Sequence, residues 1–343
     1  MSRFPIVKRD RMAAWAHRHG ITTRIDNHFV VCPLEGFEKP LRVAAVNDEV
    51  VVLALVLPLR DENSDLGLVG ANPEERQAIL YDRAMGKWKP KELYYPAAGD
   101  DPPYIKVATQ LYLSEGATDT QLDEGMCDVL DALFDALAFH PSVVMAAAEA
   151  SVKATGEPKP VTWKLLDHRR QHASAAPAKL TNKTEDSERI PWWDIDQEKV
   201  GKAVTAQRLV NILRWYDAEI SCEKHGENDV ISLRRKGLPI EVLVSPHGRI
   251  SICYHRELTL EEANSPGLKE WLAENIDKYG WVQIGMRRHS AGMTLRFESW
   301  QPAMRVTEEQ IDAFLNFVLE AFRSCIDRLD RALGLVVIEG KGE

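Results

Sequence analysis

Two stretches of this sequence have the same form and decide how the fold is interpreted. Residues 118–137 read TDTQLDEGMCDVLDALFDAL, and residues 307–326 read TEEQIDAFLNFVLEAFRSCI, at an offset of 189 residues (307 − 118). Each begins with a threonine followed three residues later by a glutamine, which is the capping-box pattern of a helix start. Each then continues with apolar residues at the spacing of one helix face, so each predicts a long amphipathic helix.

The apolar faces of these two predicted helices correspond position by position. In the second helix the face consists of Ile311, Phe314, Leu315, Val318, Phe322, Cys325, Ile326 and Leu329. The positions 189 residues earlier are Leu122, Gly125, Met126, Val129, Leu133, Ala136, Leu137 and His140, six of which are plainly apolar. Because Gly125 stands where Phe314 does, we expect the two cores to be packed differently.

The segments before the two helices also correspond. Backwards along the chain, each half has a predicted strand, a helical segment, a hairpin and a short opening helix. They span 104–113, 72–88, 41–57 and 9–20 in the first half, and 292–300, 265–280, 240–255 and 205–217 in the second. Both predicted strands alternate apolar and more polar residues, which indicates burial of one face. We therefore predict an internal duplication with an α+β fold: two repeated domains, each an antiparallel sheet packed by helices, in the order helix, about four strands, helix, two strands and long C-terminal helix.

This pattern divides the chain into four parts. We predict a first domain at 1–150, a linker at 151–203, a second domain at 204–335 and a tail at 336–343. The linker is rich in Pro, Ala, Ser, Thr and charge, and such a composition cannot bury enough surface to fold alone.

The linker contains two adjacent tryptophans, Trp192 and Trp193. Burying each could contribute roughly 2–3 kcal/mol, so we expect them either to dock the linker onto this protein's own domains or to anchor a partner. Together with Trp300, which we expect to be exposed, they are the candidate partner-binding residues.

The composition excludes several classes of protein. The 343 residues are 45% hydrophobic and 28% charged, as in a globular protein with room for two domains. The net charge of −9 disfavours sequence-independent binding to nucleic acid. There is no apolar run of 18 residues and no export signal, and the five scattered cysteines form no CxxC motif. We expect a cytoplasmic protein with reduced cysteines and no contact with a membrane.

Motifs of catalysis and cofactor binding are missing from the sequence. No phosphate-binding glycine loop, nucleophile elbow, kinase signature or protease signature occurs, so we expect no enzymatic activity and no cofactor. His168 and His172 have a spacing that could ligate zinc, but no third ligand follows, and we interpret them as part of a solvated linker. We expect no metal site.

Two groups of charged residues need an interpretation. We interpret an acidic stripe on the first long helix as a solvated outer face; it consists of Glu124, Asp128, Asp131 and Asp135. Two basic pairs in the second half form a candidate anion patch if their strands meet in one sheet; they are Arg234, Arg235, Arg287 and Arg288. Polar strand edges explain these arginines about as well.

Each half resembles the YbjN domain, a bacterial family with a type III secretion chaperone-like fold. The resemblance is carried by residues 116–137 (GATDTQLDEGMCDVLDALFDAL) and 305–322 (RVTEEQIDAFLNFVLEAF), by the opening WAHRHGITTRIDNHFVV at 15–31, and by the hairpin IEVLVSPHGRISICYH at 240–255. It covers about 140 residues of the first half and 130 of the second. It implies an α+β fold, usually dimeric, without enzymatic activity and with a regulatory or chaperone-like binding role.

These observations favour a non-enzymatic, chaperone-like or regulatory protein whose tandem domains form an intramolecular pseudo-dimer that holds an extended segment of an unidentified protein partner. The alternative is a structural or oligomerisation scaffold that acts by self-association. Apolar residues off the main helix faces motivate it; they are Leu130, Phe134, Phe317 and Leu319. An enzyme or sensor for a small anionic ligand, using the arginine pairs, is the least favoured.

Overall fold

The computed structural model describes residues 4–33, 39–46, 49–58, 73–85, 88, 90–98, 103–137, 204–214, 220–235, 237–246, 248–275, 282–303 and 306–335. The predicted linker and tail lie outside the described residues, so the predicted domain boundaries stay predictions.

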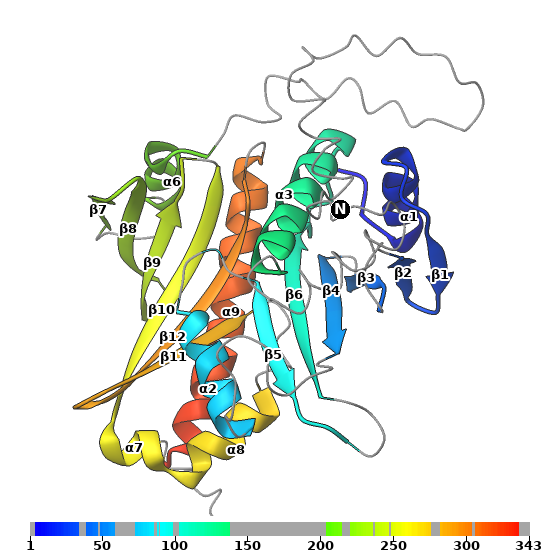
Figure 1. The fold of residues 1–343 in the computed structure, drawn as a ribbon. Helices are drawn as coiled ribbons and strands as arrows, with labels where there is room; N and C mark the ends of the chain where they lie inside the picture. Colours follow the sequence, from blue (N-terminus) through cyan, green and yellow to red (C-terminus); the bar gives the residue numbers. More distant parts are fainter. Residues whose placement is uncertain are drawn as a thin grey trace, which may run out of the picture.

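The described residues form two halves with the same order of elements (Figure 1). The first half contains α1 (Arg9–Arg18), β1 (Arg24–Asp26), β2 (Phe29–Cys32), β3 (Leu41–Val46), β4 (Val50–Pro58), α2 (Pro73–Arg83), β5 (Lys91–Tyr95), β6 (Tyr104–Tyr112) and α3 (Asp119–Leu137). The second half contains α6 (Ala206–Leu213), β7 (Ile220–His225), β8 (Asn228–Arg235), β9 (Leu238–Val244), β10 (Arg249–Thr259), α7 (Leu260–Asn264), α8 (Pro266–Asn275), β11 (Gln283–His289), β12 (Gly292–Pro302) and α9 (Glu308–Ala332). Only the short α7 has no counterpart among the described residues of the first half.

The strand order repeats as well. The first six-stranded sheet has the order β1-β2-β3-β4-β6-β5, and the second, taken from its opposite edge, has the order β7-β8-β9-β10-β12-β11. Every described pair of neighbouring strands is antiparallel. The predicted α+β fold of two repeated domains is therefore confirmed.

The capping boxes form at the start of both long helices, as the sequence predicts. The Thr118 hydroxyl accepts from the Gln121 backbone N–H at 3.1 Å, and the Gln121 side chain accepts from the Thr118 N–H at 2.9 Å. Thr307 and Gln310 make the same two bonds at 3.2 and 2.9 Å. These bonds satisfy N–H groups that have no partner within the helix, so the threonine fixes where each helix begins.

Each half buries its own core between the inner face of its sheet, which we define as the face toward its own long helix, and that helix. The first core gathers α1, the inner residues of β2 to β6 and the apolar face of α3. The second core gathers α6, α8, the inner residues of β8 to β12 and the apolar face of α9. The expected difference in packing is confirmed, because a Cβ atom at Gly125 would lie 2.8 Å from Leu111 Cδ2, whereas Phe314 packs its ring 5.9 Å from that of Tyr112.

The outer faces of the two sheets, which face away from their own long helices, are partly covered by the opposite half. Tyr112 on the outer face of β6 packs against Phe314 and Phe317 of α9. Trp300 on the outer face of β12 joins the core of the first half. Figure 1 shows α3 and α9 in the middle of the molecule, between the strands of the two sheets. Burial on one face alone was therefore the wrong expectation for β6 and β12, since consecutive residues such as Ser299 and Trp300 are both 2% exposed.

The capping glutamines of the two halves meet at the start of the long helices. Gln121 Nε2 donates to Gln310 Oε1 at 2.9 Å, and Gln310 Nε2 donates to the Gly116 carbonyl at 2.9 Å. Both side chains are 8% exposed. Two residues separated by the 189-residue offset therefore contact each other directly, as equivalent residues do at a twofold axis.

Helix α2 of the first half packs against two edge strands, β5 of its own sheet and β11 of the other. Gln283 Nε2 on β11 donates to the Ala84 carbonyl at 3.3 Å, and Arg296 on β12 donates to the Met85 carbonyl. These side chains satisfy carbonyls at the C-terminal end of α2, which have no partner within the helix. The second half thus completes a helix of the first.

A valine at Gly285 tests this docking. A Cβ atom there would lie 2.9 Å from the backbone carbon of Ala84 and the backbone nitrogen of Met85, and backbone cannot move aside as a side-chain end can. We expect Gly285→Val to lower the free energy of unfolding by about 1–3 kcal/mol and to speed hydrogen exchange of the α2 amides. His289→Val, at an exposed site on the same strand, should stay within about 0.5 kcal/mol of the wild type. Unchanged stability and exchange in Gly285→Val would rule out the docking.

Candidate functional site

The structure tests one of the three candidate partner-binding tryptophans. Trp192 and Trp193 lie outside the described residues, as do His168 and His172. Trp300 is 2% exposed, so the expectation of an exposed side chain was wrong. Its ring packs into the first half, with the Arg249 guanidinium 5.4 Å above it, because α3 covers this part of β12. As the chain stands, Trp300 cannot meet a partner.

The candidate anion patch does not form. β8 and β11 belong to one sheet, but β9, β10 and β12 lie between them, so the two arginine pairs are about 19 Å apart at ~4.8 Å per strand. Arg235 is buried and pairs with Asp312 at 3.1 Å, and Arg287 pairs with Asp82 at 2.9 Å. Arg288 donates to the Asn264 side chain, and Arg234 donates to the Gly237 carbonyl.

The interpretation of the acidic stripe as a solvated face was wrong for Asp128. Its carboxylate receives two bonds from Arg249 of the second half, at 2.7 Å from Nη2 and 3.0 Å from Nε, and its side chain is 15% exposed. Glu124 lies near Gln310 and Gln301 of the second half, in a small cleft between the halves. The stripe therefore faces the other half.

The apolar residues off the main helix faces are covered within this chain as well. Leu130, Phe134 and Leu319 are buried, and Phe317 stacks on Tyr112 with ring centroids 4.6 Å apart. The observation that motivated a scaffold built by self-association is thus accounted for by contacts inside the molecule.

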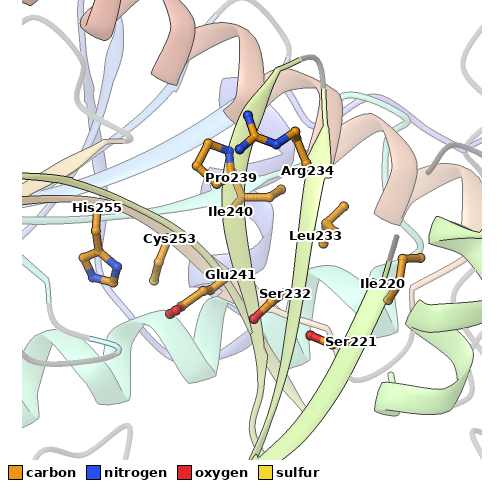
Figure 2. Close-up of a pocket in the computed structure, with 10 residues that line it drawn as sticks. All are labelled: Ile220, Ser221, Ser232, Leu233, Arg234, Pro239, Ile240, Glu241, Cys253 and His255. Carbon is orange, nitrogen blue, oxygen red and sulfur yellow. The ribbon is translucent and has the colours of Figure 1, made fainter. Parts of the chain in front are cut away.

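A hollow of about 740 Å³ lies on the outer face of the second sheet. Four neighbouring strands, β7 to β10, line it, as Figure 2 shows. The lining residues are Ile220, Ser221, Ser232, Leu233, Arg234, Pro239, Ile240, Glu241, Cys253 and His255. Its volume falls in the range of sites that hold small ligands or peptide side chains. We call this feature the hollow.

The hollow combines both charges with hydroxyl groups and apolar surface. Arg234 and Glu241 supply the charges, from adjacent strands. The pKa of His255 lies below its usual value, because partial burial disfavours the charged ring and outweighs the opposing effect of Glu241. His255 is therefore neutral at pH 7, and the lining does not concentrate charge of one sign.

Cys253 is the most reactive type of side chain in the hollow, but its environment keeps it inert. Burial and the neighbouring Glu298 raise the pKa of its thiol to about 12. A cysteine nucleophile needs a lowered pKa, because the thiolate is the reacting form. The arrangement suits noncovalent binding.

A buried polar cluster borders the hollow on the side of β12. Arg296 pairs with Glu298 at 3.0 Å and donates to Cys253 Sγ at 3.2 Å, and Glu298 accepts from the Ser251 hydroxyl. Arg296 and Glu298 are 5% and 1% exposed. Because Arg296 also bonds the Met85 carbonyl, this cluster ties the floor of the second sheet to the first half.

Sequence reasoning missed the hollow. Within 249–255 (RISICYH) the polar residues Ser251, Cys253 and His255 alternate with the core residues Ile250, Ile252 and Tyr254. This alternation marks an outer face, but it does not say which part of that face stays uncovered.

Two absences apply to the described part of the chain. No three His, Cys, Asp or Glu side chains there cluster closely enough to hold a metal ion. Within the same residues, every helix is too short or too polar to cross a membrane.

Comparisons with known proteins give one structural likeness. No protein-family model matches the chain, and no curated protein does. Among solved structures it is similar to the crystal structure of YbjN from E. coli, described provisionally as a transcription regulator, with 12% identity and a TM-score of 0.31. The match covers 44% of this chain and 96% of that one. A TM-score this low carries no argument, so the fold assignment rests on the strand order and pairing, and the secretion-chaperone resemblance stays a prediction.

Thiol labelling tests the environment of Cys253. In the native protein at pH 8, iodoacetamide should modify the exposed Cys222 first. Cys32, Cys253 and Cys325 should react last, because burial raises their pKa values to about 11, 12 and 12. Protein unfolded in guanidinium provides the control, in which all five thiols react, and mass spectrometry assigns the order. If Cys253 reacted as fast as Cys222 in the native protein, the description of the hollow's floor would be wrong.

Proposed function

We propose that this chain is a non-enzymatic binding protein whose hollow holds an extended segment of a protein partner. The observation that carries the proposal is the hollow itself, an uncovered part of a sheet face in a molecule whose other central strands are covered on both faces. Its floor presents side chains in rows along antiparallel strands, and an extended chain has matching spacing. Its serines and its charges of both signs complement the donors and acceptors of a peptide.

The edge of the same sheet supports this proposal. β7 borders the hollow and, in the part of the chain described, pairs with β8 alone. A strand edge offers backbone donors and acceptors to an incoming extended segment. Glu223, Lys224 and His225 on β7 are exposed, so this edge also carries the charges that limit nonspecific pairing.

The intramolecular pseudo-dimer is the second part of the proposal. The contact between Gln121 and Gln310, the ion pair between Asp128 and Arg249, and the docking of α2 on β11 support it. In this arrangement the first half holds the second sheet in place and covers one end of its outer face, while the second half provides the hollow.

Peptide selection against the full chain tests the proposed function. Peptides displayed on phage would be selected on the wild-type protein, and their affinities measured for variants. Ser232→Trp places a large ring in the hollow from an exposed position, so we expect at least tenfold weaker binding of the selected peptides.

Lys269→Trp on α8 is the matched control, because it adds the same ring at an exposed position away from the hollow, and it should leave the affinities unchanged. Selection without any peptide whose binding depends on Ser232 would contradict the proposed function.

A further inference from the structure

A small apolar cluster, separate from both main cores, lies at one end of the hollow. It consists of Val230, Leu243 and Cys253, on the outer faces of β8, β9 and β10. Cys253 belongs to both the cluster and the hollow, so the two are continuous. We call this cluster the apolar subsite.

A tryptophan of the first half fills the apolar subsite. Trp88 packs against the cluster, and its ring makes an edge-on contact with Trp300 at 6.5 Å between centroids and 87° between planes. Trp88 is only half-buried, although a tryptophan is the largest side chain that could fill such a site. Part of its ring thus stays in reach of solvent.

The backbone of Trp88 is in an unfavourable conformation. Its φ angle is 61°, in the left-handed region that residues other than glycine adopt infrequently. Such a conformation persists where surrounding contacts hold it, and it is found often at switches and ligand clamps. The contacts of Trp88 with the second half therefore act against a local backbone preference.

The docking of α2 does not depend on Trp88. Its end is held by Gln283 on the Ala84 carbonyl, by Arg296 on the Met85 carbonyl and by Arg287 on Asp82. These contacts precede Trp88 in the chain and use other groups. The Trp88 ring can leave the subsite while the two halves stay together.

We propose that Trp88 occupies the anchor position of the binding face, and that the partner segment carries an aromatic side chain that takes its place. This inference rests on the proposed function of the hollow. The subsite is apolar and flat against Trp300, so it suits an aromatic ring, and the partner's flanking residues then extend over Cys253 toward Glu241 and Ser232. Aromatic side chains are the usual anchors of such interfaces. Without a partner, Trp88 shields the subsite and weakens binding.

The experiment uses a peptide from this chain as the probe. A labelled peptide with the sequence of residues 84–90, AMGKWKP, contains the side chain seen in the subsite. We expect it to bind full-length Trp88→Ala at least tenfold more tightly than the wild type, measured by fluorescence anisotropy. The peptide AMGKAKP, which has the same charge, should not bind. Lys269→Ala, at an exposed site on α8, should behave as the wild type does.

A second variant guards against loss of structure. Trp88→Gly removes the ring and also relieves the backbone strain, so it should stay folded and give the same gain in affinity. Equal binding of AMGKWKP to the wild type and to both variants, or no binding to either variant, would overturn the inference.

Peptides selected on the hollow separate this inference from the proposed function. If they lose affinity for Ser232→Trp but bind Trp88→Ala and the wild type equally, Trp88 does not guard the site and the proposed function stands. If Ser232→Trp leaves their affinity unchanged, the proposed function itself fails. A gain for Trp88→Ala with both the selected peptides and AMGKWKP supports both.

Discussion

The contact between Gln121 and Gln310 is the constraint on which the arrangement of the two halves depends. Each glutamine already closes the capping box of its own long helix, so its position is set by the start of that helix. The remaining amide hydrogens are satisfied across the boundary between the halves, where both side chains are buried. A buried amide without a partner costs free energy, so the two helix starts are held together.

That arrangement explains why the central strands are buried on both faces. Each long helix packs on its own sheet and also meets the outer face of the opposite sheet, through Tyr112 on one side and Trp300 on the other. The coverage is incomplete, because one helix cannot span six strands. On the second sheet the uncovered part carries Ser251, Cys253 and His255 on β10, where β4 of the first sheet carries Val52, Ala54 and Val56. The halves share a topology but differ in what their outer faces present.

Much of the fold could be predicted from the sequence because local signals specified it. Thr118 and Thr307 mark helix starts, alternation marks 104–113 as a strand, and the constant offset reveals the repeat. The contacts between the halves could not be predicted in this way. The burial of Trp300 and the pairing of Asp128 with Arg249 depend on how two surfaces dock, and single residues in an alternating pattern look alike whether the other half or water covers them. The hollow was missed for the same reason, since it is the part of a face that docking leaves open.

A double-mutant cycle on Gln121 and Gln310 tests the central claim most directly. The free energy of unfolding would be measured by chemical denaturation for Gln121→Ala, Gln310→Ala, the double variant and the wild type. If the two amides contact each other across the halves, the cycle should give a coupling free energy of about 0.5–3 kcal/mol, although 189 residues separate them in the sequence. Additive effects, with a coupling free energy near zero, would contradict the packing of the two halves described above.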